Sequence, residues 1–280
     1  MKKIIAALDG LKFSNSTCDY AVFLAKHSGA HLVGVFLDDF TYHSYKVYDL
    51  MRDEASNSGS KLKQLETIDL QMRTEAVEQF EISCRQSGVE YSIHHDRNIA
   101  IKELLHESIY ADLLVISSRE TLTHYNEKLP TRFIRDLLSH AQCPVLIVPQ
   151  TFRPINNLVL LFDGAPSSVH AIKMFSYCLD PLKQYPTTVL SVKEKQQSLH
   201  IPDHHLIKEF MKRHFPSAVF KVLKGKPAIE IVNYLEQWDH GSLVILGAYG
   251  RNDVSRWFRE SMADILMKDF KVPLFIAHHS

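Results

Sequence analysis

The sequence has no long apolar run, few cysteines and no excess of charge of either sign. Its longest apolar stretch, 20–25, is far shorter than the roughly 20 residues of a membrane-spanning helix. The 4 cysteines form no Cys-x-x-Cys pair, which predicts reduced, buried thiols in a cytoplasmic protein. Lys and Arg total 32, as do Asp and Glu, so we expect neither a nucleic acid nor a membrane surface as partner. The apolar stretch at 4–8 is too short for a secretory signal.

The common catalytic motifs are missing as well. The sequence has no Gly-x-Ser-x-Gly elbow, no His-Glu-x-x-His pair and no Walker loop. We therefore expect no dedicated enzyme and no catalytic residues, with weak ATP hydrolysis left open. Among the 16 histidines, His200 and His204 have a spacing compatible with metal binding, but Pro202 lies between them and no cysteine completes a set. No metal site is expected.

The sequence does have an internal repeat. Leu8-Asp9-Gly10 returns as Phe162-Asp163-Gly164, 154 residues later. The segments 111–116 and 143–148 return in the same order at 241–246 and 272–277, at offsets of 130 and 129. With 280 residues, this repeat predicts two domains, at 1–149 and 155–280, and an insertion at about 40–88 in the first.

Each half alternates short apolar strands with helices, which predicts a parallel sheet covered on both faces. Strands are expected at 3–8, 31–37, 89–94, 113–117 and 145–148, and at 158–162, 188–192, 219–223, 243–246 and 274–277. Helices are expected at 16–27, 59–87, 99–109 and 131–140, and at 168–179, 204–214, 228–238 and 261–270. Ligands of such sheets lie beyond the carboxyl ends of the strands, where the strand order reverses.

The most informative motif follows the fourth strand of the second half. Gly247 and Gly250 are separated by two residues, and nine residues later Glu260-Ser261 precedes a helical pattern. The glycines would let backbone amides approach a phosphate, and a helix start capped by Ser261 would favour an anion. Taken alone, a Gly-x-x-Gly is better explained by a turn that needs a positive φ.

Together with the Asp-Gly turns and the prolines that open the last strands, Pro144 and Pro273, this spacing resembles the universal stress protein family. The resemblance covers nearly the whole chain as a tandem pair. It implies two α/β Rossmann-like domains of the adenine nucleotide alpha hydrolase-like type, each a five-stranded parallel sheet flanked by helices. It also implies that strands 145–148 and 274–277 meet around a pseudo-twofold axis, an intramolecular pseudo-dimer, with a homodimer of whole chains as a further option.

The resemblance also implies a ligand, an adenine nucleotide in the second half. The candidates are ATP, with Mg²⁺, and AMP. In the family an aspartate lies near the adenosine, which matches Asp163, and a second-strand residue packs on the adenine, which matches Val192. The expected binding residues are Leu161, Phe162, Asp163, Val192, Leu246, Gly247, Gly250, Arg251, Ser261 and Met262.

Two departures from the family pattern lie in the second half. Glu260 stands where the family has a third glycine, and Ala263 where nucleotide-binding members often have a hydroxyl residue. A carboxylate at 260 would repel a phosphate unless Mg²⁺ bridges them. It is equally well explained as a first-turn acid that stabilises the helix dipole.

The first half departs further. The corresponding register reads Ser117-Ser118-Arg119-Glu120, then Pro130-Thr131, with neither glycine. We interpret this site as degenerate for ATP, with Pro130 and Thr131 marking the start of a helix.

The insertion contains a helical apolar stripe: Leu65, Ile68, Met72, Ala76 and Phe80. Packing of this stripe on the sheet is the favoured interpretation, and a lid or partner-binding segment is the alternative. Two hypotheses for function follow. One is a nucleotide-binding regulatory module of the stress response, and the other is an interaction protein that acts on an unknown partner through its surfaces.

Overall fold

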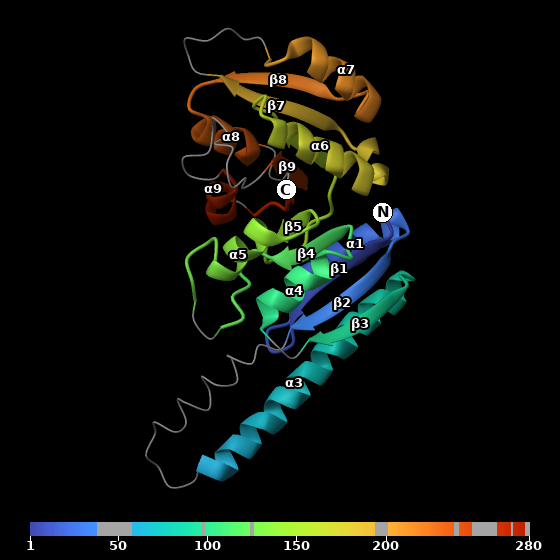
Figure 1. Ribbon diagram of the computed structural model, residues 1–280, viewed down its shortest axis with the longest axis vertical. Coiled ribbons are helices and arrows are strands. Elements are labelled where there is room, and N and C mark those ends of the chain that lie inside the picture. The colour runs from blue at the N-terminus through green and yellow to red at the C-terminus, as the bar shows by residue number, and fades with distance from the viewer. Residues whose placement is uncertain are drawn as a thin grey trace.

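The computed structural model describes residues 1–37, 58–96, 99–123, 126–193, 201–237, 241–247, 262–269 and 271–277. Its strands form one sheet in the order β3-β2-β1-β4-β5-β10-β9-β6-β7-β8 (Figure 1). The first half contributes β1 to β5, at Lys3–Asp9, His31–Leu37, Tyr91–Asp96, Leu113–Ser117 and Val145–Val148. The second contributes β6 to β10, at Asn157–Leu161, Thr187–Lys193, Val219–Lys224, Ser242–Gly247 and Leu274–Ala277. The two halves thus repeat one strand order, as the repeat predicts.

The halves join through their last strands. β5 and β10 pair antiparallel, with Leu146 opposite Phe275, whereas the other paired strands are parallel. The expectation that these two strands meet is therefore confirmed, and the pseudo-twofold axis stays a prediction. Because the strand direction reverses at this junction, the carboxyl ends of the two halves lie at opposite edges of the sheet. Any site at one switch point is remote from the other.

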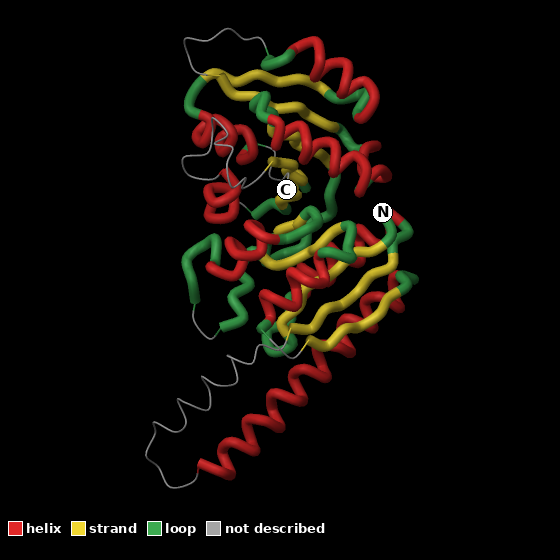
Figure 2. Tube along the Cα trace, in the orientation of Figure 1, coloured by secondary structure: helices red, strands yellow, loops and turns green. Residues whose placement is uncertain are grey.

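Helices cover both faces of the sheet (Figure 2). In the first half they are α1 (Asn15–Ser28), α3 (Ser58–Ser87), α4 (Ala100–Ser108) and α5 (Arg132–His140). In the second they are α6 (Pro166–Cys178), the 3₁₀-helix η1 (Asp180–Gln184), α7 (His204–His214), α8 (Pro227–Glu236) and α9 (Met262–Asp269). Side chains of α1, α3, α6 and α7 share one apolar core with the sheet, and those of α4, α5, α8 and α9 share the other. Each core runs through both halves.

Helix α3 confirms only part of the expected stripe. Ala76 and Phe80 are buried, and Phe80 packs so closely on β2 that a Cβ at Gly34 would lie 2.7 Å from its ring. Ile68 and Met72 are 45% and 41% exposed. The prediction that the stripe packs on the sheet was therefore wrong for these two residues. The reason is length, because α3 extends well past the edge of the sheet (Figure 1).

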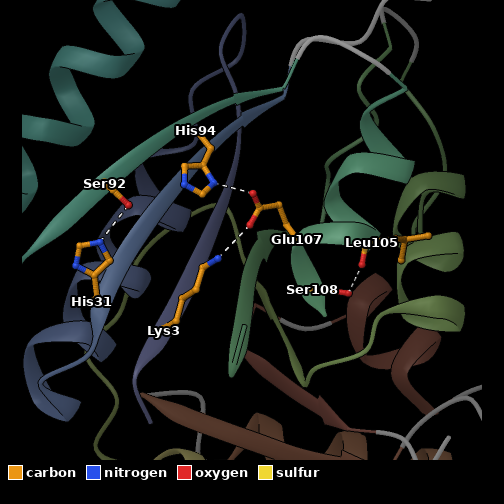
Figure 3. Close-up of polar contacts among 7 residues, drawn as sticks. All are labelled: Lys3, His31, Ser92, His94, Leu105, Glu107 and Ser108. Carbon is orange, nitrogen blue, oxygen red and sulfur yellow. Dashed lines mark hydrogen bonds and ion pairs between the residues drawn. The ribbon is translucent and has the colours of Figure 1, made fainter. Parts of the chain in front are cut away.

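A partly buried polar cluster fastens α4 to the sheet (Figure 3). Lys3 Nζ donates to Glu107 Oε2 at 3.1 Å, and His94 Nδ1 lies 2.6 Å from Glu107 Oε1. Burial by itself would raise the pKa of Glu107, but the contacts from His94 and Lys3 outweigh it and lower the pKa. This cluster joins β1, β3 and α4, so it is explained by the fold.

The four cysteines are free and buried, as expected. Burial raises the pKa of Cys18 to about 11 and that of Cys143 to about 12, so these thiols stay protonated at neutral pH. None of the described helices combines the length and the apolar composition that crossing a membrane requires.

Candidate functional site

The second half brings three of the expected site residues to one edge of the sheet. Strand β6 lies between β7 and β9, which makes its carboxyl end the switch point of this half. Asp163 follows β6, Val192 lies near the end of β7, and Gly247 ends β9. Asp163 is half-buried, and its Oδ1 accepts a hydrogen bond of 2.9 Å from the backbone amide of Ala165. Its carboxylate can therefore still reach a ligand from solvent.

Gly247 has a packing role in this arrangement. A Cβ there would lie 2.4 Å from the backbone carbonyl group of Ser167, at the start of α6. The cavity between Asp163, Ser167 and Gly247 is only about 10 Å³, room for about one water molecule. A nucleotide would therefore lie over the strand ends, outside this cavity.

The remaining expected residues fall into two groups. Leu161, Phe162, Leu246 and Met262 are at most 4% exposed, so their side chains form the floor beneath the strand ends. Gly250, Arg251, Ser261 and Glu260 lie outside the described residues. The nucleoside contacts expected at Asp163 and Val192 and the phosphate contacts expected at Gly250 and Ser261 therefore all stay predictions.

The matching edge of the first half is organised around a buried carboxylate. Glu120 is only 7% exposed, and its Oε1 accepts hydrogen bonds of 3.0 Å from Thr121 N and 3.1 Å from Leu122 N. These amides follow β4, where the family pattern places phosphate-binding glycines. An internal carboxylate thus accepts hydrogen bonds from two backbone amides of this loop. The sequence showed the charge of Glu120 but not this contact.

Asp9 adjoins Glu120 and is 4% exposed. Burial, and then the charge of Asp9, raise the pKa of Glu120 to about 7. Burial also raises the pKa of Asp9, against the opposing effects of the Leu11 amide, Lys12 and Arg73. Glu120 therefore takes up a proton near neutral pH, next to a second buried carboxylate.

Both Asp-Gly turns are covered by the chain that follows the second strand of their half. A Cβ at Gly10 would lie 3.2 Å from Arg73 Cγ on α3. A Cβ at Gly164, whose φ is +88°, would lie 2.6 Å from the Pro202 ring. The first half thus places Arg73 against its Asp-Gly turn, and the second half places the Pro202 ring against Gly164. Sequence analysis missed Arg73, since its place in an inserted helix gave no signal.

The structure confirms the expectation that Pro130 and Thr131 mark the start of a helix, which is α5. Thr131 caps α5 by accepting a hydrogen bond of 3.2 Å from Ile134 N, and its hydroxyl donates to the Glu120 carbonyl oxygen. Thr131 therefore fixes the loop that carries Glu120. Beside this loop lies a polar cavity of about 410 Å³, lined by Lys12, Ser14, Asn15, Arg119, Glu120 and Gln150, among others.

Comparison with known proteins places the chain in a family. The model of the Universal stress protein family matches residues 1–149. A universal stress protein from Archaeoglobus fulgidus has a TM-score of 0.69 at 12% identity, over 99% of this chain and 98% of that chain. A putative universal stress protein from Pseudomonas aeruginosa has a TM-score of 0.57 at 16% identity, over 99% and 93%. No curated protein is significantly similar. At these identities the likeness shows the fold.

Proposed function

Because the chain belongs to the universal stress protein family, we propose that it is a cytoplasmic regulatory protein of the stress response that holds one adenine nucleotide in its second half. The observation that carries the proposal is the meeting of Asp163, Val192 and Gly247 at the ends of β6, β7 and β9. We assign no catalytic residue. The nucleotide acts here as a bound signal.

The contrast between the two aspartates supports a single site. Asp163 is half-buried, whereas Asp9 is 4% exposed beside Glu120. A carboxylate that accepts hydrogen bonds from ribose hydroxyls must be reachable and must not compete with a second buried anion. Only the second half meets both conditions among the described residues.

Glu260 determines which nucleotide binds best in this proposal. One charge pair at ~4 Å in an effective dielectric of about 20 is worth ~4 kcal/mol, and solvent reduces that value. Triphosphate binding would then require Mg²⁺ to bridge the two anions, whereas AMP places less charge near residue 260. We therefore expect AMP to bind more tightly than metal-free ATP.

Titration calorimetry tests the nucleotide proposal. The unmodified chain and the variant Glu260→Gly are titrated with AMP and with ATP, each with and without Mg²⁺. We expect AMP to bind the unmodified chain, and Glu260→Gly to strengthen metal-free ATP binding by roughly tenfold or more. A chain that binds neither nucleotide would contradict the proposal. Tight metal-free ATP binding by the unmodified chain would show that Glu260 points away from the phosphates.

A second candidate function is interaction with a protein partner. The observation that favours it is the apolar surface of α3, where Ile68, Leu70, Met72 and Ile82 are between 41% and 65% exposed. Mutation of these side chains to Ser should leave nucleotide binding unchanged. If the chain binds no nucleotide, this surface becomes the leading candidate for function.

A further inference from the structure

A basic cleft lies where the two halves meet. Its cavity of about 250 Å³ is lined from the first half by the end of β4 and the chain after β5, and from the second half by the end of α9. Its described lining includes four cationic side chains, Arg119, Arg153, Lys268 and Lys271, and no carboxylate among the described residues. The whole chain has a formal net charge of zero, so this is a local concentration of one sign.

Among the residues that the structure describes, three of these cations have no anionic partner. Arg119, Lys268 and Lys271 are exposed and form no ion pair with any of the residues that the structure describes. Gathered around one cavity, like charges repel each other, and a bound anion relieves that repulsion. The neutral side chains of Ser118 and Gln150 add hydrogen-bond donors to the same wall.

Helix stability explains only part of this arrangement. Lys268 and Lys271 flank the C-terminal end of α9, where cations stabilise the helix dipole. That role does not account for Arg119 and Arg153, which belong to the first half and line the same cavity. Arginine in particular suits phosphate, because its planar guanidinium can donate two parallel hydrogen bonds.

We propose that this inter-half cleft binds a small phosphorylated anion. Its volume lies just below the roughly 300–1,000 Å³ typical of sites for drug-sized ligands, which fits a pyrophosphate or the phosphoryl end of a larger metabolite. Because both halves contribute cations, the anion fastens one half to the other.

The cleft is separate from the nucleotide site of the proposed function. It lies at the carboxyl edge of the first half, where β4 ends and α9 leads into β10. Asp163 lies at the carboxyl edge of the second half, which is the opposite edge of the sheet because β5 and β10 run antiparallel. A substitution can therefore abolish binding at one site and leave binding at the other unchanged.

Calorimetric titration of the full chain with inorganic pyrophosphate tests the cleft. The variant Arg119→Gln/Lys271→Gln removes two exposed cations, and Lys26→Gln/Lys102→Gln removes two exposed cations elsewhere as the matched control. We expect one pyrophosphate per chain, a Kd at least ~tenfold higher in the cleft variant, and an unchanged Kd in the control. Added salt should weaken binding.

Three outcomes would overturn the proposal. They are no pyrophosphate binding by the unmodified chain, an equal loss in the cleft and control variants, and loss of pyrophosphate binding in Asp163→Ala. The last would place the anion at the nucleotide site. A parallel titration with adenosine, which has no phosphate, reports on the second-half site alone, and the cleft variant should not change it.

Discussion

At the scale of single residues, Glu120 places a buried carboxylate at the switch point of the first half. Its carboxylate accepts hydrogen bonds from the backbone amides of Thr121 and Leu122, and it is buried beside Asp9. Leu122 has a φ of +50°, which folds the loop back onto this carboxylate. The family pattern could predict that the site had changed. It could not predict this contact, because the contact depends on the shape of the loop.

The raised pKa of Glu120 predicts a pH dependence of stability. Between its ordinary value of 4.5 and about 7, the folded state holds a proton that the unfolded state releases, so stability falls as pH rises through this window. Glu120→Gln keeps an oxygen for both amides and removes the charge. We expect it to raise the free energy of unfolding at pH 8 by on the order of 2 kcal/mol, and to change it little at pH 4.5.

Urea unfolding of both proteins from pH 4.5 to pH 8 measures this difference. The matched control is Glu66→Gln on the exposed surface of α3, which should follow the unmodified chain at every pH. Parallel profiles for Glu120→Gln and the unmodified chain would mean that Glu120 is not buried as an anion.

Gly247 provides a second prediction at this scale. A Cβ there would lie 2.4 Å from the backbone of Ser167, which cannot move without shifting α6. We expect Gly247→Ala to lower the free energy of unfolding by about 2 kcal/mol or more. Gly10→Ala is the control, because its closest contact is the flexible side chain of Arg73 at 3.2 Å. Equal losses in the two variants, measured by urea unfolding, would refute a special packing role for Gly247.

At the scale of elements, α3 divides into a docked part and a projecting part. Phe80 is fully buried against Gly34, whereas Leu70 is 65% exposed. Phe80→Ala should therefore cost about 3–5 kcal/mol of unfolding free energy, and Leu70→Ala should change it by less than about 0.5 kcal/mol. Thermal and urea unfolding of both variants check this. A large loss for Leu70→Ala would show that the projecting part is packed after all.

The same helix marks the limit of sequence patterns. Helical periodicity predicted α3 to within a residue at its start and correctly at its end. It could not show where the helix passes beyond the sheet, since an apolar stripe looks alike whether or not a surface lies opposite it. For short strands such as Leu113–Ser117 the prediction matched the structure, because burial on both faces leaves a continuous apolar run.

At the scale of the whole molecule, the repeat in the sequence was the decisive signal. Without the pair of β5 and β10 each half would expose its last strand as a further open edge, and here these two strands pair. The proposed domain limits, 1–149 and 155–280, stay a prediction. Both apolar cores run through the junction, so the structure offers no break between the halves.

The central claim is that two halves of one fold have diverged at their switch points, so that only the second holds a nucleotide. Native mass spectrometry of the full chain with excess AMP tests it directly, because it counts bound ligands. Asp9 and Asp163 are matched, since each accepts a hydrogen bond from the amide two residues on. We predict one AMP per chain, lost in Asp163→Ala and kept in Asp9→Ala. Two AMP per chain, or loss in Asp9→Ala alone, would contradict the account.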